Sequence, residues 1–484
     1  MLHVKLSVVF FLALSVVSVG AQDFHQRIRA ALENRDYAAA SAELQNLQRA
    51  DKKVFEVNNY DYLLARVAQR RGDFAAAMAN YEAVVKRNSV LREYALWHLS
   101  QVARASGNLM LERVYLSELL TTAPSSLLIP AAQARMARSN FESKDFDAAI
   151  RQLSAAGEPL AAITDSRSKT VAAIVPAGEP SRENQVLIGQ SYLQSGKTNE
   201  AREVFTKLLT NLPNPAQPDD FALIAAKSLD EMDSEKGAFG KTAPRLADLE
   251  HFKRAKIYQF NRDFADARLH FIAIVERYPQ SPNLAESLYQ IGRGYTQENN
   301  FNEAIKWFER VVAEFPEDAY ARDGLSQAAN AYARVNKPKE ALTRYQRFIE
   351  KYAGEENSER AYLNIIDILR DTGEDTDAVK WAQKTREAFK GGLPEALAVF
   401  AQARVHIAKN DWQSALNDLN ELQTFPDLGG TRVAGATNKA EVSFLKGYAL
   451  EQLQRFSEAI DVYLSIPDGR AEYYGWRATE RLRA

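Results

Sequence analysis

The chain contains no cysteine among its 484 residues. Structural disulfides, thiolate zinc sites and cysteine nucleophiles are therefore excluded. Histidine is scarce, and the six residues at positions 3, 25, 98, 251, 270 and 406 form no HxH or HxxxH pair. Because paired histidines on one helix face are a common metal-binding pattern, we expect no metal site and interpret the histidines as surface or hairpin-interface residues.

An excess of charge of one sign is also lacking, since 61 Lys and Arg residues stand against 63 Asp and Glu residues. This balance creates no positive field for a polyanion, so we expect no nucleic-acid partner. Apolar residues make up 46% of the chain, which excludes disorder as its main state. The length exceeds that of one ordinary globular core, so we expect several domains or an array of repeats.

Long hydrophobic runs are missing except at the N-terminus, where LSVVFFLALSVVSV follows Lys5. The run is short for a hydrocarbon layer of about 30 Å, and small residues end it at Ala21. A basic start, an apolar stretch and a V-x-A exit are typical of a secretory signal peptide, so we expect residues 1–21 to be removed. An uncleaved anchor is the alternative. Cleavage predicts an exported protein without a transmembrane segment, located in the periplasm if the source is Gram-negative.

Motifs of catalysis and cofactor binding are missing too. GAFGKT at 237–242 ends like a phosphate-binding loop, but Glu235 stands where that loop requires its first glycine. There is no G-x-S-x-G motif, and no pair of carboxylates stands out as an acid and base. We therefore expect no catalytic residue, no cofactor and no metal.

The chain does contain a recurring seven-residue motif, which we call the recurring phrase. In it, polar residues precede an aromatic residue, the marker, and an alanine follows the marker by three residues. It reads NRDYAAA at 34–40, RGDFAAA at 71–77, SKDFDAA at 143–149, NRDFADA at 261–267 and KNDWQSA at 409–415. From Phe264 the marker position recurs every 37 residues, at Phe301, Pro338, Asp375 and Trp412. A fixed period in this range predicts a stacked array of repeats.

Each repeat carries two segments whose apolar residues are spaced by three and four, which predicts two helices and no strand. The polar break between them suits an αα-hairpin turn. We expect the marker to begin the second helix and the alanine to lie where the two helices approach closest. The predicted repeat positions are Tyr37, Ala40, Phe74, Ala77, Phe146, Ala149, Phe264, Ala267, Phe301, Ala304, Ala341, Ala378, Trp412, Ala415, Phe456 and Ala459.

The stretch YQIGRGYTQENNFNEAIKWFERVVAEFP resembles a tetratricopeptide repeat (TPR), with Gly292, Tyr295, Ala304, Phe308 and Pro316 at the positions that the family's pattern uses. The period of 37 exceeds the usual 34 and is similar to the longer-spaced TPRs of bacterial envelope proteins. The resemblance implies an all-α solenoid of hairpins wound into a right-handed superhelix. It also implies a non-catalytic scaffold that binds a protein, peptide or cell-wall partner on its concave face.

The regular period fails in the middle of the chain, where GEP turns and further Pro- and Gly-containing breaks interrupt the helical pattern. Long loops inside a solenoid are often functional or mobile. The expected organisation is an N-terminal TPR-like array over 22–156, an inserted loop over 157–182, an irregular helical segment with long loops over 183–245, a regular array of period 37 over 246–466, and an aromatic and basic capping helix over 467–484.

Aromatic and basic residues gather near the C-terminus, at Tyr473, Tyr474, Trp476 and Arg477. The stretch DGRAEYYGWRATERLRA is similar to the end of the helical superhelix in soluble lytic transglycosylases, which cleave peptidoglycan. The resemblance implies an alternative function, as the superhelical domain of such an enzyme without its catalytic domain, because the family's Glu-Ser and Gly-Leu-Met-Gln motifs are missing here. The four residues either cover the apolar end of the array or form a docking surface.

Overall fold

The computed structural model describes residues 19–155, 181–354, 358–433, 435–467 and 472–483. Residues 1–18 of the predicted signal peptide and residues 157–180 of the predicted inserted loop lie outside this part of the chain. Within the described part, no helix combines the length and the apolarity that crossing a membrane requires.

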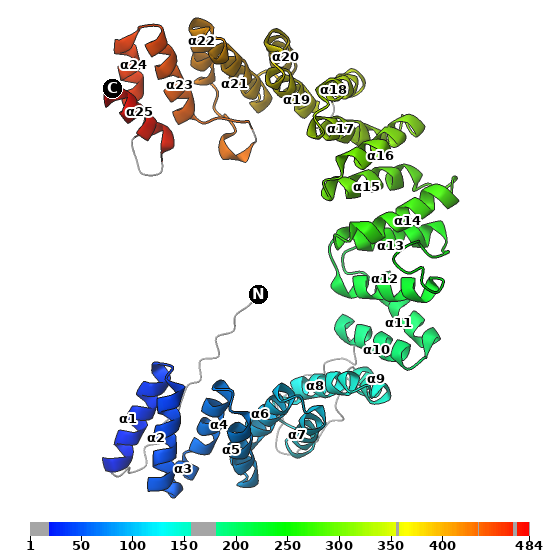
Figure 1. Ribbon diagram of the computed structural model, residues 1–484, viewed down its shortest axis with the longest axis vertical. Coiled ribbons are helices and arrows are strands. Elements are labelled where there is room, and N and C mark those ends of the chain that lie inside the picture. Colours follow the sequence, from blue (N-terminus) through cyan, green and yellow to red (C-terminus); the bar gives the residue numbers. More distant parts are fainter. Residues whose placement is uncertain (1–18, 156–180, 355–357, 434, 468–471, 484) are drawn as a thin grey trace, which may run out of the picture. The chain divides into compact units, whose positions relative to one another are not determined.

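The described residues form helices joined by turns and loops, with an isolated β-bridge but no β-strand (Figure 1). The predicted all-α fold is therefore confirmed for these residues. The helices are α1 (Val19–Glu33), α2 (Tyr37–Ala50), α3 (Lys52–Val57), α4 (Tyr60–Arg70), α5 (Phe74–Lys86), α6 (Arg92–Ala105), α7 (Leu109–Thr122), α8 (Ile129–Glu142), α9 (Phe146–Ala155), α10 (Arg182–Gln194), α11 (Thr198–Thr210), α12 (Asp220–Asp233), α13 (Asp248–Phe260), α14 (Phe264–Arg277), α15 (Leu284–Gln297), α16 (Phe301–Glu314), α17 (Ala319–Arg334), α18 (Pro338–Tyr352), α19 (Ser358–Asp371), α20 (Asp375–Ala388), α21 (Leu393–Ala408), α22 (Trp412–Leu422), the 3-10 helix η1 (Gly430–Arg432), α23 (Lys439–Gln452), α24 (Phe456–Leu464) and α25 (Tyr473–Arg483).

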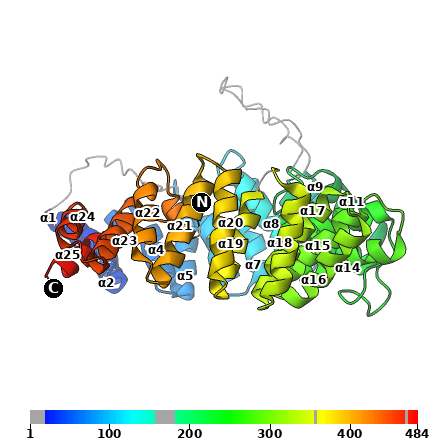
Figure 2. The ribbon, with the colours of Figure 1, turned by 90° about the horizontal axis from the view of Figure 1, so that it is seen from above.

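The chain divides into two compact units. The first comprises Met1–Asn214 and Asp220–Met232, and the second comprises Pro215–Asp219 and Asp233–Ala484. In each unit, consecutive helices pair into hairpins and each hairpin packs on the next, as α13/α14 packs on α15/α16. Helices α19 and α20, for example, lie side by side with nearly parallel axes in Figure 2.

One turn design recurs at the hairpins and accounts for the polar start of the recurring phrase. The residue just before each second helix is often Asp or Asn, and its side chain accepts a hydrogen bond from the third residue of that helix, as Asp36 does from the Ala39 amide at 2.9 Å. This contact satisfies a backbone donor that the helix itself leaves open. One residue earlier the backbone is left-handed, which favours Gly and Asn. These left-handed residues are Arg35, Gly72, Gly107, Lys144, Gly196, Arg262, Asn299, Asn336, Gly373, Asn410 and Gln454.

Apolar side chains from successive hairpins form cores that run through several repeats. In the first unit, one core extends from α4 to α8 and includes the fully buried Tyr81 and Leu116. In the second unit, another extends from α15 to α21 and includes Leu288, Ile365 and Val405. A single hairpin is too thin to bury its own apolar face, so its stability depends on its neighbours.

A half-buried histidine in the first unit leads to a pH-dependent stability. His98 of α6 stacks on Tyr81 at 5.5 Å between ring centroids. Burial, together with the charge of Arg66, lowers the pKa of His98 from 6.5 to about 4. Because this folded-state pKa lies below the unfolded value, the neutral ring contributes stability above about pH 6.5 that is lost as the pH falls toward 4.

We therefore expect the first unit to lose stability between pH 6.5 and pH 4, and a His98→Phe variant, which keeps a flat ring but cannot titrate, to lose much less. Hydrogen exchange of α5 and α6 at several pH values measures this directly. The same pH dependence in the wild-type protein and in His98→Phe would contradict the assignment to His98.

Candidate interaction surface

The first helices of the hairpins in the second unit offer an extended surface. Figure 1 shows α13, α15, α17, α19, α21 and α23 along one side of this stack, with their second helices along the other side. We call the exposed side of these helices the first-helix face. The residues of these helices that concern us are Phe252 and Lys256 of α13, Glu286, Tyr289 and Arg293 of α15, Asp367 of α19, and Phe400 and Arg404 of α21. The Tyr289 and Phe400 rings are buried beneath the face, at 8% and 4% exposure, whereas Arg293 is exposed.

Cations lie over aromatic rings at the same register of three first helices. The Arg293 guanidinium lies 6.0 Å from the centre of the Tyr289 ring, and Tyr289 precedes Arg293 by four residues in the helix. The pairs Lys256 over Phe252 and Arg404 over Phe400 repeat this spacing, at 5.7 Å in both cases. The three aromatic positions are separated by one and by three periods of 37 residues. The repeat period therefore places a cation–π pair at equivalent places along the face.

A hydrogen-bonded carboxylate links the first three of these helices. Glu286 accepts a hydrogen bond from Lys256 of α13 at 2.7 Å. Burial raises the pKa of Glu286, but hydrogen bonds from Lys256 and from Tyr320 of α17 outweigh burial and lower its pKa overall. Glu286 is therefore ionised at neutral pH and compensates the charge of Lys256.

Arg293 differs from Lys256 because its charge is not compensated. It is exposed and forms no ion pair within the described part of the chain. A guanidinium group on an aromatic ring can hold a carboxylate with two parallel hydrogen bonds and can also contact an apolar side chain. Arg293 is therefore the position of this face that is best prepared for an acidic partner group.

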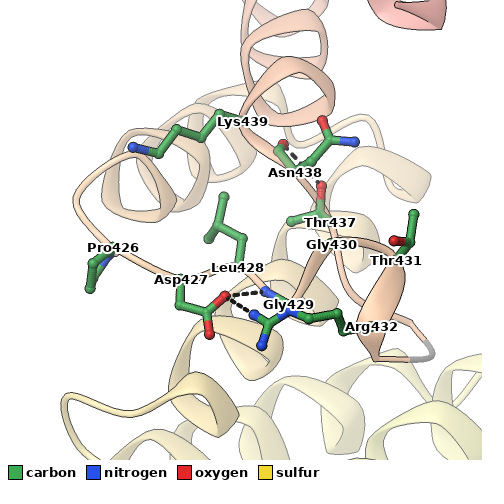
Figure 3. Close-up of a pocket in the computed structure, with 10 residues that line it drawn as sticks. All are labelled: Pro426, Asp427, Leu428, Gly429, Gly430, Thr431, Arg432, Thr437, Asn438 and Lys439. Atoms are coloured by element: carbon green, nitrogen blue, oxygen red, sulfur yellow. Dashed lines mark hydrogen bonds and ion pairs between the residues drawn. The ribbon is translucent and has the colours of Figure 1, made fainter. Parts of the chain in front are cut away.

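A long loop between α22 and α23 borders the first-helix face (Figure 1). Asp427 holds this loop by accepting hydrogen bonds from the Gly429 amide at 3.0 Å and from the Arg432 guanidinium at 2.6 Å (Figure 3). Leu428 anchors the loop in the core that also contains Phe400. The loop is visible in the sequence as a marker spacing of 44 residues, from Trp412 to Phe456, in place of 37.

The loop borders an open hollow of about 400 Å³, lined by Pro426, Asp427, Leu428, Gly429, Gly430, Thr431, Arg432, Thr437, Asn438 and Lys439 (Figure 3). The polar groups that line it form hydrogen bonds with neighbouring residues of the same chain. Asn438 caps α23, and the Thr437 hydroxyl donates a hydrogen bond to Glu441 at 2.8 Å. We therefore interpret the loop as a wall of the first-helix face and assign no ligand to the hollow.

The predicted repeat positions fall into two structural classes. The aromatic positions are the first residues of second helices, namely Tyr37, Phe74, Phe146, Phe264, Phe301, Trp412 and Phe456. The alanines are all buried, with exposed fractions of at most 3%, namely Ala40, Ala77, Ala149, Ala267, Ala304, Ala341, Ala378, Ala415 and Ala459. The alanines are core residues of the hairpins, whereas among the aromatic positions Phe456 is 57% exposed.

Sequence reasoning missed a further close contact between the two helices of a hairpin. A Cβ atom placed on Gly292 of α15 would lie 2.6 Å from the ring of Phe308 in α16. Gly189 with Phe205 and Gly447 with Tyr463 repeat this contact at 2.6 and 2.5 Å. The glycine therefore makes room for the aromatic residue that follows it in the second helix. The regular spacing of Gly and aromatic residue in these three repeats was the available signal.

Two of the histidines that are far apart in the sequence lie side by side in the structure. His251 of α13 and His270 of α14 are both buried, with their Nδ1 atoms 2.9 Å apart. They lie 19 residues apart on the two helices of one hairpin, so a search for pairs on a single helix misses them. In the part of the chain that the structure describes, no group of three or more candidate ligands could hold a metal ion.

The other two candidate motifs are placed as follows. GAFGKT at 237–242 forms turns, and the next helix begins only at Asp248, so this segment lacks the helix that a phosphate-binding loop needs. In α25, which packs against α23 and α24, Tyr473 and Trp476 are exposed, Tyr474 is half-buried, and Arg477 lies 5.8 Å from the Phe444 ring centre.

Comparison with known families identifies repeats in both units. One tetratricopeptide-repeat model matches residues 62–126 and 252–322, and another matches residues 183–215. A model of the 26S proteasome subunit RPN7 matches residues 326–474. No curated protein sequence matches the chain.

Solved structures with similar folds are only distantly related. Yeast Tom70 is 14% identical, with 96% of this chain and 95% of that chain covered and a TM-score of 0.30. The C-terminal part of a TPR repeat-containing protein from Cytophaga hutchinsonii is 13% identical, covering 63% and 99%, with a TM-score of 0.34. YrrB, described as a TPR protein with an unusual peptide-binding site, is 19% identical, covering 37% and 87%, with a TM-score of 0.31. Identities and TM-scores this low give no basis for assigning a function. The family matches identify tetratricopeptide repeats in each unit of the chain.

Proposed function

We propose that the protein is a non-catalytic scaffold that binds a segment of a partner protein along the first-helix face of its second unit. The observation that carries this proposal is the periodic placement of cation–π pairs at Phe252/Lys256, Tyr289/Arg293 and Phe400/Arg404. Arginine and aromatic residues are enriched among the residues that dominate binding energies at interfaces. Stacked repeats present such groups on a large preformed surface, which suits an extended partner.

The chemistry of the face favours a partner segment with both acidic and apolar side chains. The first helices follow one another along the second unit, so an extended segment that crosses the face contacts one first helix after another. A carboxylate suits Arg293, and apolar side chains suit the exposed parts of Phe252 and of the neighbouring stems.

The place of action that we propose is the cell envelope, and the periplasm in a Gram-negative source. This part of the proposal rests on the N-terminal sequence, whose basic start, apolar run and exit at Ala21 fit a secretory signal peptide. The partner is then a protein or peptide of the envelope, or peptidoglycan. The resemblance to lytic transglycosylases stays a prediction, and no contact in the described residues favours it over the scaffold.

Charge reversal at Arg293 tests the binding face. Peptides selected from a displayed random library on the chain without residues 1–21 should bind Arg293→Glu at least about tenfold more weakly, since a hydrogen bond to a charged group contributes about 1.5–3 kcal/mol. Fluorescence anisotropy of labelled peptides measures the affinities. The matched control is Lys306→Glu, because Lys306 is an exposed cation on the second helix α16.

Lys306→Glu should leave these affinities unchanged, and circular dichroism should show both variants folded. Peptides that bind the wild-type protein and Arg293→Glu equally well would contradict the proposed face. An equal loss in both variants would point to a general effect of charge.

A further inference from the structure

The first unit contains a half-buried guanidinium group whose charge is not compensated. Arg66 of α4 donates a hydrogen bond from Nη1 to Gln69 at 3.3 Å, and the same atom lies 3.1 Å from Nδ1 of His98 in α6. Arg66 forms no ion pair with the residues that the structure describes. Removing a charge from water is costly unless a group of opposite sign lies beside it. An external anion would supply such a group.

The cation at the equivalent place of the second unit is compensated. Arg66 stands seven residues before Asp73, the cap residue of α5. Lys256 stands seven residues before Asp263, the cap residue of α14. Lys256 forms its ion pair with Glu286 on the next first helix, at 2.7 Å, so this pair carries no net charge. In the second unit the chain therefore supplies the anion itself.

A tyrosine takes the place of that anion in the first unit. Glu286 stands 14 residues before Asn300, the cap residue of α16. Tyr94 stands 14 residues before Asn108, the cap residue of α7. A phenol hydroxyl can donate a hydrogen bond to an anion, but it does not neutralise a guanidinium group at neutral pH. At this place the first unit therefore keeps the cation and has no carboxylate.

The side chains around Arg66 are neutral and can donate hydrogen bonds. Burial raises the pKa of Tyr62, the Arg66 charge opposes this increase and the Tyr94 hydroxyl adds to it, so the three side chains lie close together. The buried Tyr81 ring forms a floor, with its centroid 5.6 Å from that of Tyr62 and 5.5 Å from that of His98. His98 is neutral at pH 7 because its pKa is about 4.

Arg70 adds a second uncompensated cation. It is exposed one turn after Arg66 on α4 and, like Arg66, forms no ion pair within the described part of the chain. Burial raises the pKa of the Tyr81 hydroxyl, and the charges of Arg66 and Arg70 both oppose this increase, so both lie near that hydroxyl. In the second unit the same place, three residues before Asp263, is taken by Phe260. The first unit therefore has two positive charges where the second unit has a neutral pair.

We propose that these residues bind a phosphate group that carries two negative charges. The Arg66 site, as we call it, consists of Tyr62, Arg66, Arg70, Tyr94 and His98. A guanidinium group holds a phosphate by two parallel hydrogen bonds, and the hydroxyls and the imidazole provide further donors. Two negative charges match the two uncompensated cations, whereas a carboxylate leaves one of them without a partner. The site does not depend on the first-helix face or on the function proposed for it.

Inorganic phosphate and the peptide acetyl-Gly-Gly-phosphoserine-Gly-Gly-amide are the probes, and acetate is the singly charged control. Isothermal titration calorimetry of the protein at pH 7.5 measures the affinities. The nuclear magnetic resonance signal of His98 in protein with isotope-labelled histidine, identified by its loss in His98→Phe, reports on the site. We expect saturable binding of phosphate, at least about tenfold tighter than that of acetate, with a shift of the His98 signal. Tighter binding of the peptide assigns the site to a phosphorylated segment, and tighter binding of inorganic phosphate assigns it to a free phosphate.

Arg66→Gln should weaken the binding of phosphate at least about tenfold, because it removes the charged donor. Arg70→Gln changes an exposed side chain and should weaken it about threefold. The matched control is Arg49→Gln, since Arg49 is an exposed arginine on the second helix α2 whose hydrogen bonds go to Gln45 and Asn46. Arg49→Gln should bind like the wild-type protein, and circular dichroism should show the variants folded.

The absence of saturable phosphate binding would overturn the proposal, and so would acetate binding as tightly as phosphate. An equal loss of affinity in Arg66→Gln and Arg49→Gln would assign the effect to the overall charge and overturn it as well. Arg70→Gln decides the matter if Arg66→Gln does not fold, because an affinity equal to that of the wild-type protein would remove the second cation from the site.

Discussion

Replacing Gly292 by alanine should lower the free energy of unfolding of the second unit by about 2 kcal/mol. The added methyl group would lie 2.6 Å from Cε1 and 2.7 Å from Cδ1 of Phe308. Phe308 is fully buried in a cluster with Tyr289, Ala304 and Ala328, so its ring cannot move without opening this contact. The better helix propensity of alanine, worth about 1 kcal/mol, offsets only part of the cost.

Gly294 provides a control two residues away in the same helix. A Cβ atom there would meet Arg268 at 3.5 Å, an ordinary contact with a flexible side chain. Gly294→Ala should therefore leave stability unchanged or raise it by up to about 1 kcal/mol. Urea unfolding followed by circular dichroism, with hydrogen exchange of α15 and α16, measures both variants. Equal stability of Gly292→Ala and Gly294→Ala would show that the hairpin tolerates a wider crossing.

The recurring phrase explains why the repeated hairpin could be predicted from the sequence. A cap residue such as Asp36 is set by a contact with the third residue after it, and a small residue such as Ala40 by the crossing of two helices that are consecutive in the chain. Contacts within one hairpin recur at a fixed period. The TPR resemblance rested on such positions, and the all-α fold is confirmed for the described residues.

The first-helix face was harder to predict because it depends on contacts between repeats. The pairing of Lys256 with Glu286 joins two hairpins, and sequence spacing alone does not distinguish a paired cation from an exposed one such as Arg293.

Replacing Arg135 by leucine should destabilise the first unit by about 3 kcal/mol at pH 7.5, because it leaves a buried carboxylate without its main partner. Glu112 of α7 is 1% exposed and accepts hydrogen bonds from Nε and Nη2 of Arg135 in α8 at 2.5 and 3.1 Å. The control is Arg138→Leu on the same helix, which breaks the exposed pair with Glu183 and should cost less than about 1 kcal/mol. Urea unfolding monitored by hydrogen exchange of α7 and α8 compares the two variants.

The pH dependence of the Arg135→Leu effect identifies its origin. Burial already raises the pKa of Glu112 in the wild-type protein, and removal of Arg135 should raise it further. An acid whose folded-state pKa lies above its unfolded value destabilises the fold increasingly as the pH rises through that interval. The loss should therefore be smaller at pH 5 than at pH 7.5, and the double variant Glu112→Leu/Arg135→Leu should recover much of it. A double variant no more stable than Arg135→Leu would assign the loss to the arginine stem and to its second ion pair, with Glu142 at 2.7 Å, instead of to the unpaired Glu112 carboxylate.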